Sequence, residues 1–111
     1  MAALDEGGEA VGVLSQGVKR LARSKDFHDA WRDQRLVLAA AVVPEARFHI
    51  GTAMARNKYL YALADFAVVV SSGEKGGTWS GAIEDLRNGW CPLFVREGEG
   101  IPMGNKTLLA K

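Results

Sequence analysis

The sequence predicts an α/β fold of three layers, with about four mostly parallel strands. Four short aliphatic runs lie along the chain, and none of them alternates cleanly between apolar and polar residues. A continuous apolar run is typical of a strand buried on both faces, as in a parallel sheet. Segments with helical spacing separate the runs. Strands that alternate with helices indicate parallel βα units joined by right-handed crossovers.

The expected strands cover residues 10–14, 36–43, 66–70 and 92–95. The segments between these strands are predicted to be helical, because their apolar side chains recur at helical spacing: Val18, Leu21 and Ala22; Phe27 and Trp31; Tyr59, Ala62, Leu63 and Phe66; Trp79, Ala82, Ile83 and Leu86. The tail, 100–111, holds a proline and two glycines before a short apolar stretch. Either a last helical turn or a frayed end is compatible with that tail.

Length and composition indicate one ordinary globular domain, residues 1–111, with 48% hydrophobic residues and a formal net charge of +1. Disorder of the whole chain and a bulk polycation that wraps nucleic acid are thereby excluded, whereas a local basic groove is not. The single cysteine, Cys91, excludes an internal disulfide and a cysteine-rich zinc site. The N-terminus is acidic and no apolar run approaches the roughly 20 residues of a membrane span, so we expect a cytoplasmic protein.

Ligands of parallel α/β sheets bind beyond the carboxyl ends of the strands. The third run is followed there by a turn rich in serine and glycine, whose residues Ser72, Gly73, Gly76, Gly77 and Thr78 precede a helix. Glycines allow close backbone approach, Thr78 suits an N-cap, and the start of a helix favours an anion. The turn therefore predicts a phosphate cradle, or else a tight capped turn without a ligand.

A second group of polar residues, Arg56, Asn57 and Lys58, stands where we expect a helix to begin after the second run. Arg56 can pair with a phosphate through two hydrogen bonds, and Asn57 can donate and accept at a sugar or base edge. Lys58 would add an accessory charge. In the alternative, these side chains are solvated on the helix surface.

Other chemistry finds little support in the sequence. Neither histidine has a partner at metal-ligand spacing, and the serines lack a histidine or aspartate partner, so we predict no metal, no cofactor and no catalytic residue. Trp79 is more typical of a core position than of base stacking, and Cys91 of a packed thiol. The basic segment that holds Lys19, Arg20 and Arg23 is interpreted as a solvated helix face.

The stretch from Phe48 to Leu86 resembles the second half of the Rossmann-like domain of the DNA-processing protein A family. The similarity rests on Phe48, on Arg56-Asn57-Lys58, on the valine-rich strand and on the Ser72–Ala82 turn and helix. The ending, with Gly100, Pro102, Gly104 and Asn105, is similar to a loop of that family. The resemblance implies single-stranded DNA or a nucleotide phosphate as ligand, a role in DNA uptake and recombination, and a possible recombinase partner.

The resemblance also implies that the first two strands of the parent domain are absent here. In a 3-2-1-4-5-6 order, this absence leaves a gap between the first and second runs and two bare edges. We expect the first run to move next to the second, a second copy to fill the gap in a dimer, or a separate chain to complete the sheet.

A related superfamily offers an alternative function. Phosphoribohydrolases of the LONELY GUY type resemble this chain at Met54, Arg56, Lys58 and the Gly76-Gly77-Thr78 turn. Their acidic pair would fall on Ser80 and Gly81, so the carboxylate that assists cleavage is missing from its place; Glu84 and Asp85 lie about one turn further on. Enzymatic activity therefore stays uncertain, with binding favoured. A truncated structural remnant without a ligand is the third possibility.

Overall fold

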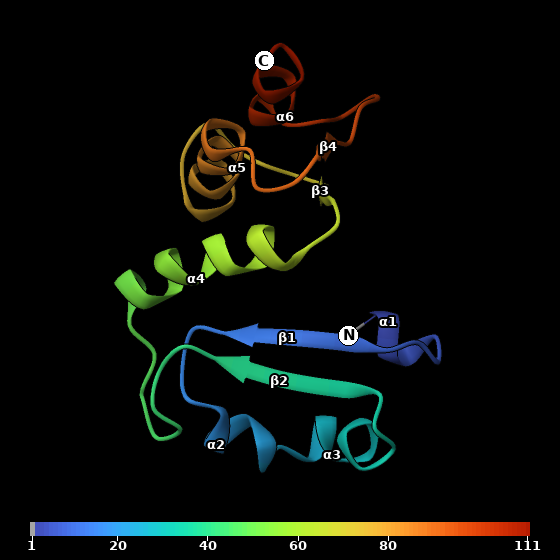
Figure 1. Cartoon of the computed structure of the whole chain (residues 1–111). Coiled ribbons are helices and arrows are strands. Elements are labelled where there is room, and N and C mark those ends of the chain that lie inside the picture. The colour runs from blue at the N-terminus through green and yellow to red at the C-terminus, as the bar shows by residue number, and fades with distance from the viewer. Residues whose placement is uncertain (1) are drawn as a thin grey trace. The chain divides into compact units, whose positions relative to one another are not determined.

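The computed structural model describes residues 2–111. The chain divides into two compact units, Met1–Arg56 and Asn57–Lys111. In chain order the elements are α1 (Ala2–Asp5), β1 (Ala10–Leu14), α2 (Val18–Ala22), α3 (Lys25–Arg32), β2 (Leu36–Ala40), α4 (Ile50–Leu63), β3 (Ala67–Val69), α5 (Gly77–Asn88), β4 (Leu93–Val95) and α6 (Met103–Leu109). Strands and helices alternate, so the predicted α/β class is confirmed (Figure 1).

In the N-terminal unit, β1 and β2 pair in parallel from Ala10 opposite Leu36 to Leu14 opposite Ala40. Helices α2 and α3 lie along one face of this pair (Figure 1), where Leu36 and Ala30 are buried. At the amino end of the strands, the Arg35 guanidinium donates to the carbonyls of Leu4 and Gly8. This contact ties the segment before β1 to the start of β2.

In the C-terminal unit, β3 and β4 also pair in parallel, with Val68 opposite Phe94. A small core forms on one face from Val69, Ala82 and Leu108, and Trp79 and Ile83 pack against it. The position of Trp79 agrees with the core role expected from the sequence. Because Leu108 belongs to this core, the tail forms a packed helix, α6, and the alternative of a frayed end is wrong.

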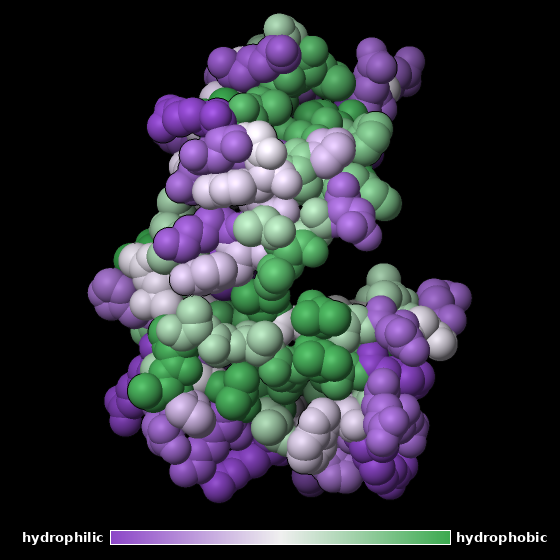
Figure 2. Space-filling view, in the orientation of Figure 1, coloured by the Kyte–Doolittle hydropathy of each residue, from purple (hydrophilic) through white to green (hydrophobic). Residues whose placement is uncertain are grey.

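Each strand pair has one bare face, which contradicts the prediction of strands buried on both sides. Val11 and Val37 face each other across β1 and β2 and are 65% and 57% exposed. Val68 and Phe94 are 57% and 58% exposed, and Phe94 meets Phe66 edge to face, with ring centroids 6.0 Å apart. The physical reason is that each unit supplies helices to one face of its strand pair. Figure 2 shows apolar side chains gathered over the β1–β2 pair.

The four strands form two two-stranded sheets, β1 with β2 and β3 with β4, within residues 2–111. The first run thus pairs directly with the second, which is one of the three outcomes expected from the sequence. The expected gap between these two runs is absent, since all five residues of β1 have a register partner in β2. The second strand is also shorter than expected and ends at Ala40. Across the same residues, no helix has the length and apolar character that a membrane span requires.

Candidate functional site

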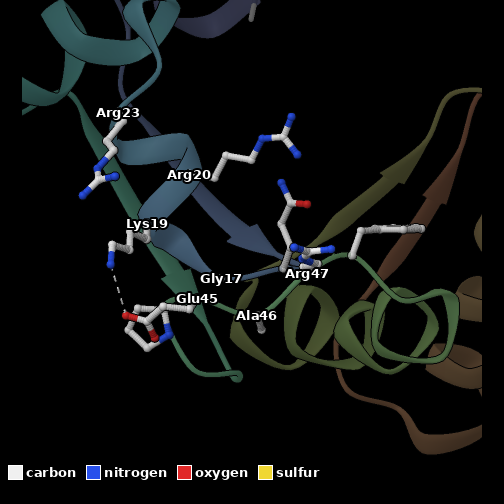
Figure 3. A pocket seen from close by; sticks show the side chains of 10 residues that line it. Gly17, Lys19, Arg20, Arg23, Glu45, Ala46 and Arg47 are labelled. Carbon is white, nitrogen blue, oxygen red and sulfur yellow. Dashed lines mark ion pairs between the residues drawn. The ribbon is translucent and has the colours of Figure 1, made fainter.

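A pocket of about 690 Å³ opens beyond the carboxyl ends of β1 and β2 (Figure 3). Two loops build it: 15–17, which leads from β1 into α2, and 41–49, which leads from β2 towards α4. The backbone N–H of Gly17 donates to the Ala46 carbonyl (2.8 Å), and that of Lys19 donates to the Pro44 carbonyl (3.1 Å). The two loops are therefore joined by main-chain hydrogen bonds, and the floor of the pocket is fixed without side chains.

Glycine is required at position 17 by the closeness of the second loop. A Cβ atom there would overlap the carbonyl groups of Pro44 and Val43. Gly17 is buried and has an extended backbone just before α2. Any larger residue would push the loops apart and open the pocket floor.

The pocket lining is strongly basic. Its charged lining consists of four cations, Lys19, Arg20, Arg23 and Arg47, and one carboxylate, Glu45. The lining therefore has an excess of three positive charges. The Lys19 ammonium lies 3.6 Å from the Glu45 carboxylate, so this acid is already paired. In Figure 3, Lys19 and Arg23 project on one side of α2, and Arg20 projects on the side where Arg47 lies. An excess of cations in a concave surface raises the local concentration of anions.

An aromatic side chain completes this pocket. Phe48 lines it and is 61% exposed. Exposed aromatic rings beside cations are the stacking surfaces on which proteins hold the bases of single-stranded nucleic acid. The pocket thus combines a cationic surface with an exposed aromatic ring.

The cations of α2 were interpreted as a solvated helix face, and they are exposed; the sequence did not show that they also line a pocket. The signal was present, because the basic segment after the first run and the Arg47-Phe48 pair after the second both follow strands that turn out to be neighbours. Only the pairing of β1 with β2 brings these segments together.

Arg56, the favoured residue of the sequence reasoning, lies in the N-terminal unit but does not line this pocket. Its guanidinium donates to the Val13 carbonyl near the end of β1, at 2.6 Å. The expectation that a helix begins here is wrong. Helix α4 begins at Ile50, where the His49 Nδ1 accepts the N–H of Gly51 (3.1 Å). The residues 56–58 are therefore in the middle of α4, away from its free N–H groups.

Asn57 and Lys58 belong to the C-terminal unit. The Asn57 amide donates to the Gly77 carbonyl at 3.3 Å, and so links α4 to the start of α5. Lys58 is exposed, with its ammonium 5.3 Å from the centre of the Tyr59 ring. Asn57 thus contacts the predicted glycine turn, and Lys58 is a surface cation.

The predicted turn, residues 72–78, lies at the carboxyl end of β3. Ser72 is buried, and its hydroxyl donates to the Gly73 carbonyl at 2.8 Å. Gly76 is the N-cap of α5, with φ of 99°, a conformation that favours glycine. Thr78 is the second residue of the helix, so its predicted role as N-cap is wrong. Gly73 and Gly76 are exposed, Gly77 is half-buried, and a twelve-residue helix begins at the end of the turn, so the features of the predicted cradle are present.

A buried acid lies further along α5. Asp85 is 1% exposed, one of its carboxylate oxygens accepts the Cys91 N–H at 3.0 Å, and the other has no hydrogen-bond partner among the described residues. Burial, together with the nearby Asp85 charge, raises the pKa of the Cys91 thiol and of the Tyr61 hydroxyl. Both groups therefore stay neutral to a higher pH than free groups do, and the half-buried Cys91 agrees with the packed thiol expected from the sequence. Within residues 2–111, no cluster of histidine, cysteine or acidic side chains could hold a metal ion.

Comparison with known proteins identifies the family of the chain. A family model described as DNA recombination-mediator protein A matches residues 1–89 of the chain. The chain belongs to this family. It is the DNA-processing protein A family that the sequence resembles, and membership supports a role in DNA processing and recombination. Searches of curated proteins and of solved structures gave no match.

Proposed function

We propose that this member of the DNA recombination-mediator protein A family binds single-stranded DNA, or a nucleotide phosphate, without cleaving it. The observation that carries the proposal is the pocket beyond β1 and β2, which combines three arginines, a lysine and the exposed Phe48 ring. Cations neutralise the backbone phosphates, and the ring stacks a base. The turn at 72–78, with Asn57 and Lys58 of the same unit, is a second candidate contact with phosphate, and Arg56 of the N-terminal unit is a separate one. The proposal includes the cytoplasmic location expected from the sequence.

The decisive experiment is the binding of fluorescent oligo-dT at low and moderate salt. The double variant Arg20→Gln/Arg47→Gln should weaken binding by about tenfold or more, because each arginine contributes a charge-assisted hydrogen bond. The slope of log K against log salt should fall by about 0.7 for each phosphate that the variant no longer neutralises. Lys25→Gln is the matched control, since Lys25 is an exposed cation of the same unit outside the pocket. If the control loses as much affinity for each charge removed as the double variant does, DNA binding does not depend on this pocket.

A variant of Phe48 would distinguish base stacking from phosphate binding. Phe48→Ala should weaken oligo-dT and leave the binding of inorganic phosphate unchanged, since stacking contributes about 1–3 kcal/mol per base. Arg56→Ala is less informative, because the same guanidinium already donates to the Val13 carbonyl. Removing it would change the end of β1 as well as any interaction with phosphate.

The hydrolase alternative has no comparable support. Glu84 lines a separate groove on α5 with Trp79, Ser80, Ile83 and Arg87, and no residue of 72–77 lines that groove. Release of a free base from a nucleoside monophosphate, abolished in Glu84→Gln, would nevertheless favour the enzyme. The binding proposal requires affinity without such release.

We also propose that a second copy of the chain, or another chain, covers the bare strand faces. Exposed apolar surfaces of this kind mark interaction sites, and Val11, Val37, Val68 and Phe94 are the residues that support the proposal. The mass in solution, recorded with the binding measurement, would show a dimer. A recombinase partner, which the family resemblance implies, would be tested by adding a purified recombinase to the protein–DNA complex.

A further inference from the structure

Helix α6 lies against the turn at 72–78, and its side chains bond directly to the backbone there. The Asn105 side chain is fully buried, and its Oδ1 accepts the backbone N–H of Ser72 at 2.7 Å. Its Nδ2 donates to the carbonyl of Val70 at 3.1 Å and to that of Arg96 at 3.0 Å. One amide therefore joins the residue after β3, the residue after β4 and the first residue of the turn.

Two neighbours of Asn105 extend this interaction along α6. Gly104 is buried, and a Cβ atom there would overlap the carbonyl groups of Gly73 and Ser72. The Thr107 hydroxyl donates to the Glu74 carboxylate at 2.9 Å. Leu108, in the core with Val69 and Ala82, holds the helix in place.

The geometry points to Asn105 as a positioning residue that holds the backbone of the 72–78 turn in the shape needed for an anion. This inference rests on the proposed function, because it gives the turn a ligand. Buried side-chain amides with all their partners satisfied fix a local conformation, and a preformed loop binds without the cost of ordering it. Asn105 touches no ligand itself and acts through the Ser72 N–H and the carbonyls of Val70 and Arg96. It also lies beyond the residues that the family model matches.

The first test measures backbone hydrogen exchange without any ligand. Asn105→Ala should speed exchange at the Ser72 N–H, which loses its acceptor, by about tenfold or more. The matched control is Leu108→Ala, a core truncation in the same helix that removes no hydrogen bond to the turn. Because Leu108 holds α6 in place, the control should speed exchange at Ser72 only by the same factor as at the other protected amides of the C-terminal unit, whereas Asn105→Ala should speed Ser72 beyond that common factor. An Asn105→Ala effect at Ser72 no larger than at those other amides would overturn the inference, since α6 would then act only through global stability.

The second test measures the affinity for inorganic phosphate and oligo-dT with the same two variants, corrected for the folded fraction. Asn105→Ala should raise the Kd for phosphate several-fold, and Leu108→Ala should not. If wild-type protein binds neither probe, the proposed function fails, while the exchange result still decides whether Asn105 holds the turn. If exchange responds and the Kd does not, the turn is no anion site and the positioning role is overturned.

A milder variant covers the case in which Asn105→Ala does not fold. Thr107→Val keeps the shape of the side chain and removes only its hydroxyl bonds, to Glu74 and to the Met103 carbonyl. Exchange at residues 74–76 should rise about two- to threefold, with an unchanged unfolding midpoint. No change at these amides would contradict the role of α6.

Discussion

The two units place a candidate anion site at the same topological position, beyond the carboxyl ends of a parallel strand pair, and build it in opposite ways. In the N-terminal unit, main-chain hydrogen bonds join the loops, and charged side chains line the surface. In the C-terminal unit, the buried Asn105 holds the loop, and glycines leave backbone as its surface. If the proposed sites bind anions, the first arrangement should give salt-dependent affinity through its charge, and the second should give selectivity for a small anion through its shape.

The largest expected effect comes from two glycines, one at each site, whose Cα atoms lie close to backbone carbonyl groups. Gly17→Ala and Gly104→Ala each place a methyl group against backbone carbonyls, which cannot move aside as a flexible side chain can. Each should lower the free energy of unfolding by about 3 kcal/mol, measured by urea denaturation. Gly73→Ala is the control, because a Cβ there meets only the Lys75 carbonyl at ordinary van der Waals distance, 3.7 Å. Destabilisation in Gly73→Ala equal to that of the other two would mean that the close approaches are not the cause.

A smaller effect is expected at alkaline pH, where two groups of the C-terminal unit, Cys91 and Tyr61, lower the stability of the fold. The raised pKa values of Cys91 and Tyr61 mean that folded protein holds these protons longer than unfolded protein does. The resulting stability is complete below the ordinary values of 9.0 for the thiol and 10.0 for the phenol, and is lost as pH rises through the higher folded values. Tryptophan fluorescence during urea unfolding should therefore show a falling midpoint above pH 9.

Cys91→Ser is the control for this effect, because a hydroxyl does not ionise in that range. The variant should lose less stability than wild type between about pH 8 and pH 10.5. A Cys91 thiol that reacts with iodoacetamide at the rate of an ordinary free thiol across this range would show that its pKa is not raised.

The smallest expected effect tests whether the net charge of the N-terminal pocket determines its affinity for DNA. Glu45→Gln removes its one carboxylate and releases Lys19 from its ion pair. Oligo-dT binding should strengthen about two- to threefold at low salt, and the gain should disappear at high salt, because exposed charges are screened. Asp26→Asn, in the same unit but outside the pocket, should change binding less. A gain that persists at high salt would point to a change in pocket shape.

The sequence by itself determined the α/β class, the positions of the four strands and the family. Local apolar runs and helical spacing depend on residues close together in the chain, and the motif Arg56-Asn57-Lys58 with the glycine turn is contiguous as well. The same local reasoning placed Trp79 in the core and Cys91 among packed groups. It could not give the start of α4, because the cap is made by a histidine side chain, His49, which is not a common N-cap residue.

Only the tertiary structure decided which strands are neighbours, which faces are covered and which residues form the pocket. Arg20 and Arg47 are 27 residues apart, and their common site depends on the pairing of β1 with β2. Asn105 reads in the sequence as part of a loop, whereas its three hydrogen bonds reach back 33 and 35 residues to Ser72 and Val70 and 9 residues to Arg96. Such interactions depend on how strands pair and helices pack. Local propensity carries no information about them, since the partners of a buried polar group are chosen by the fold.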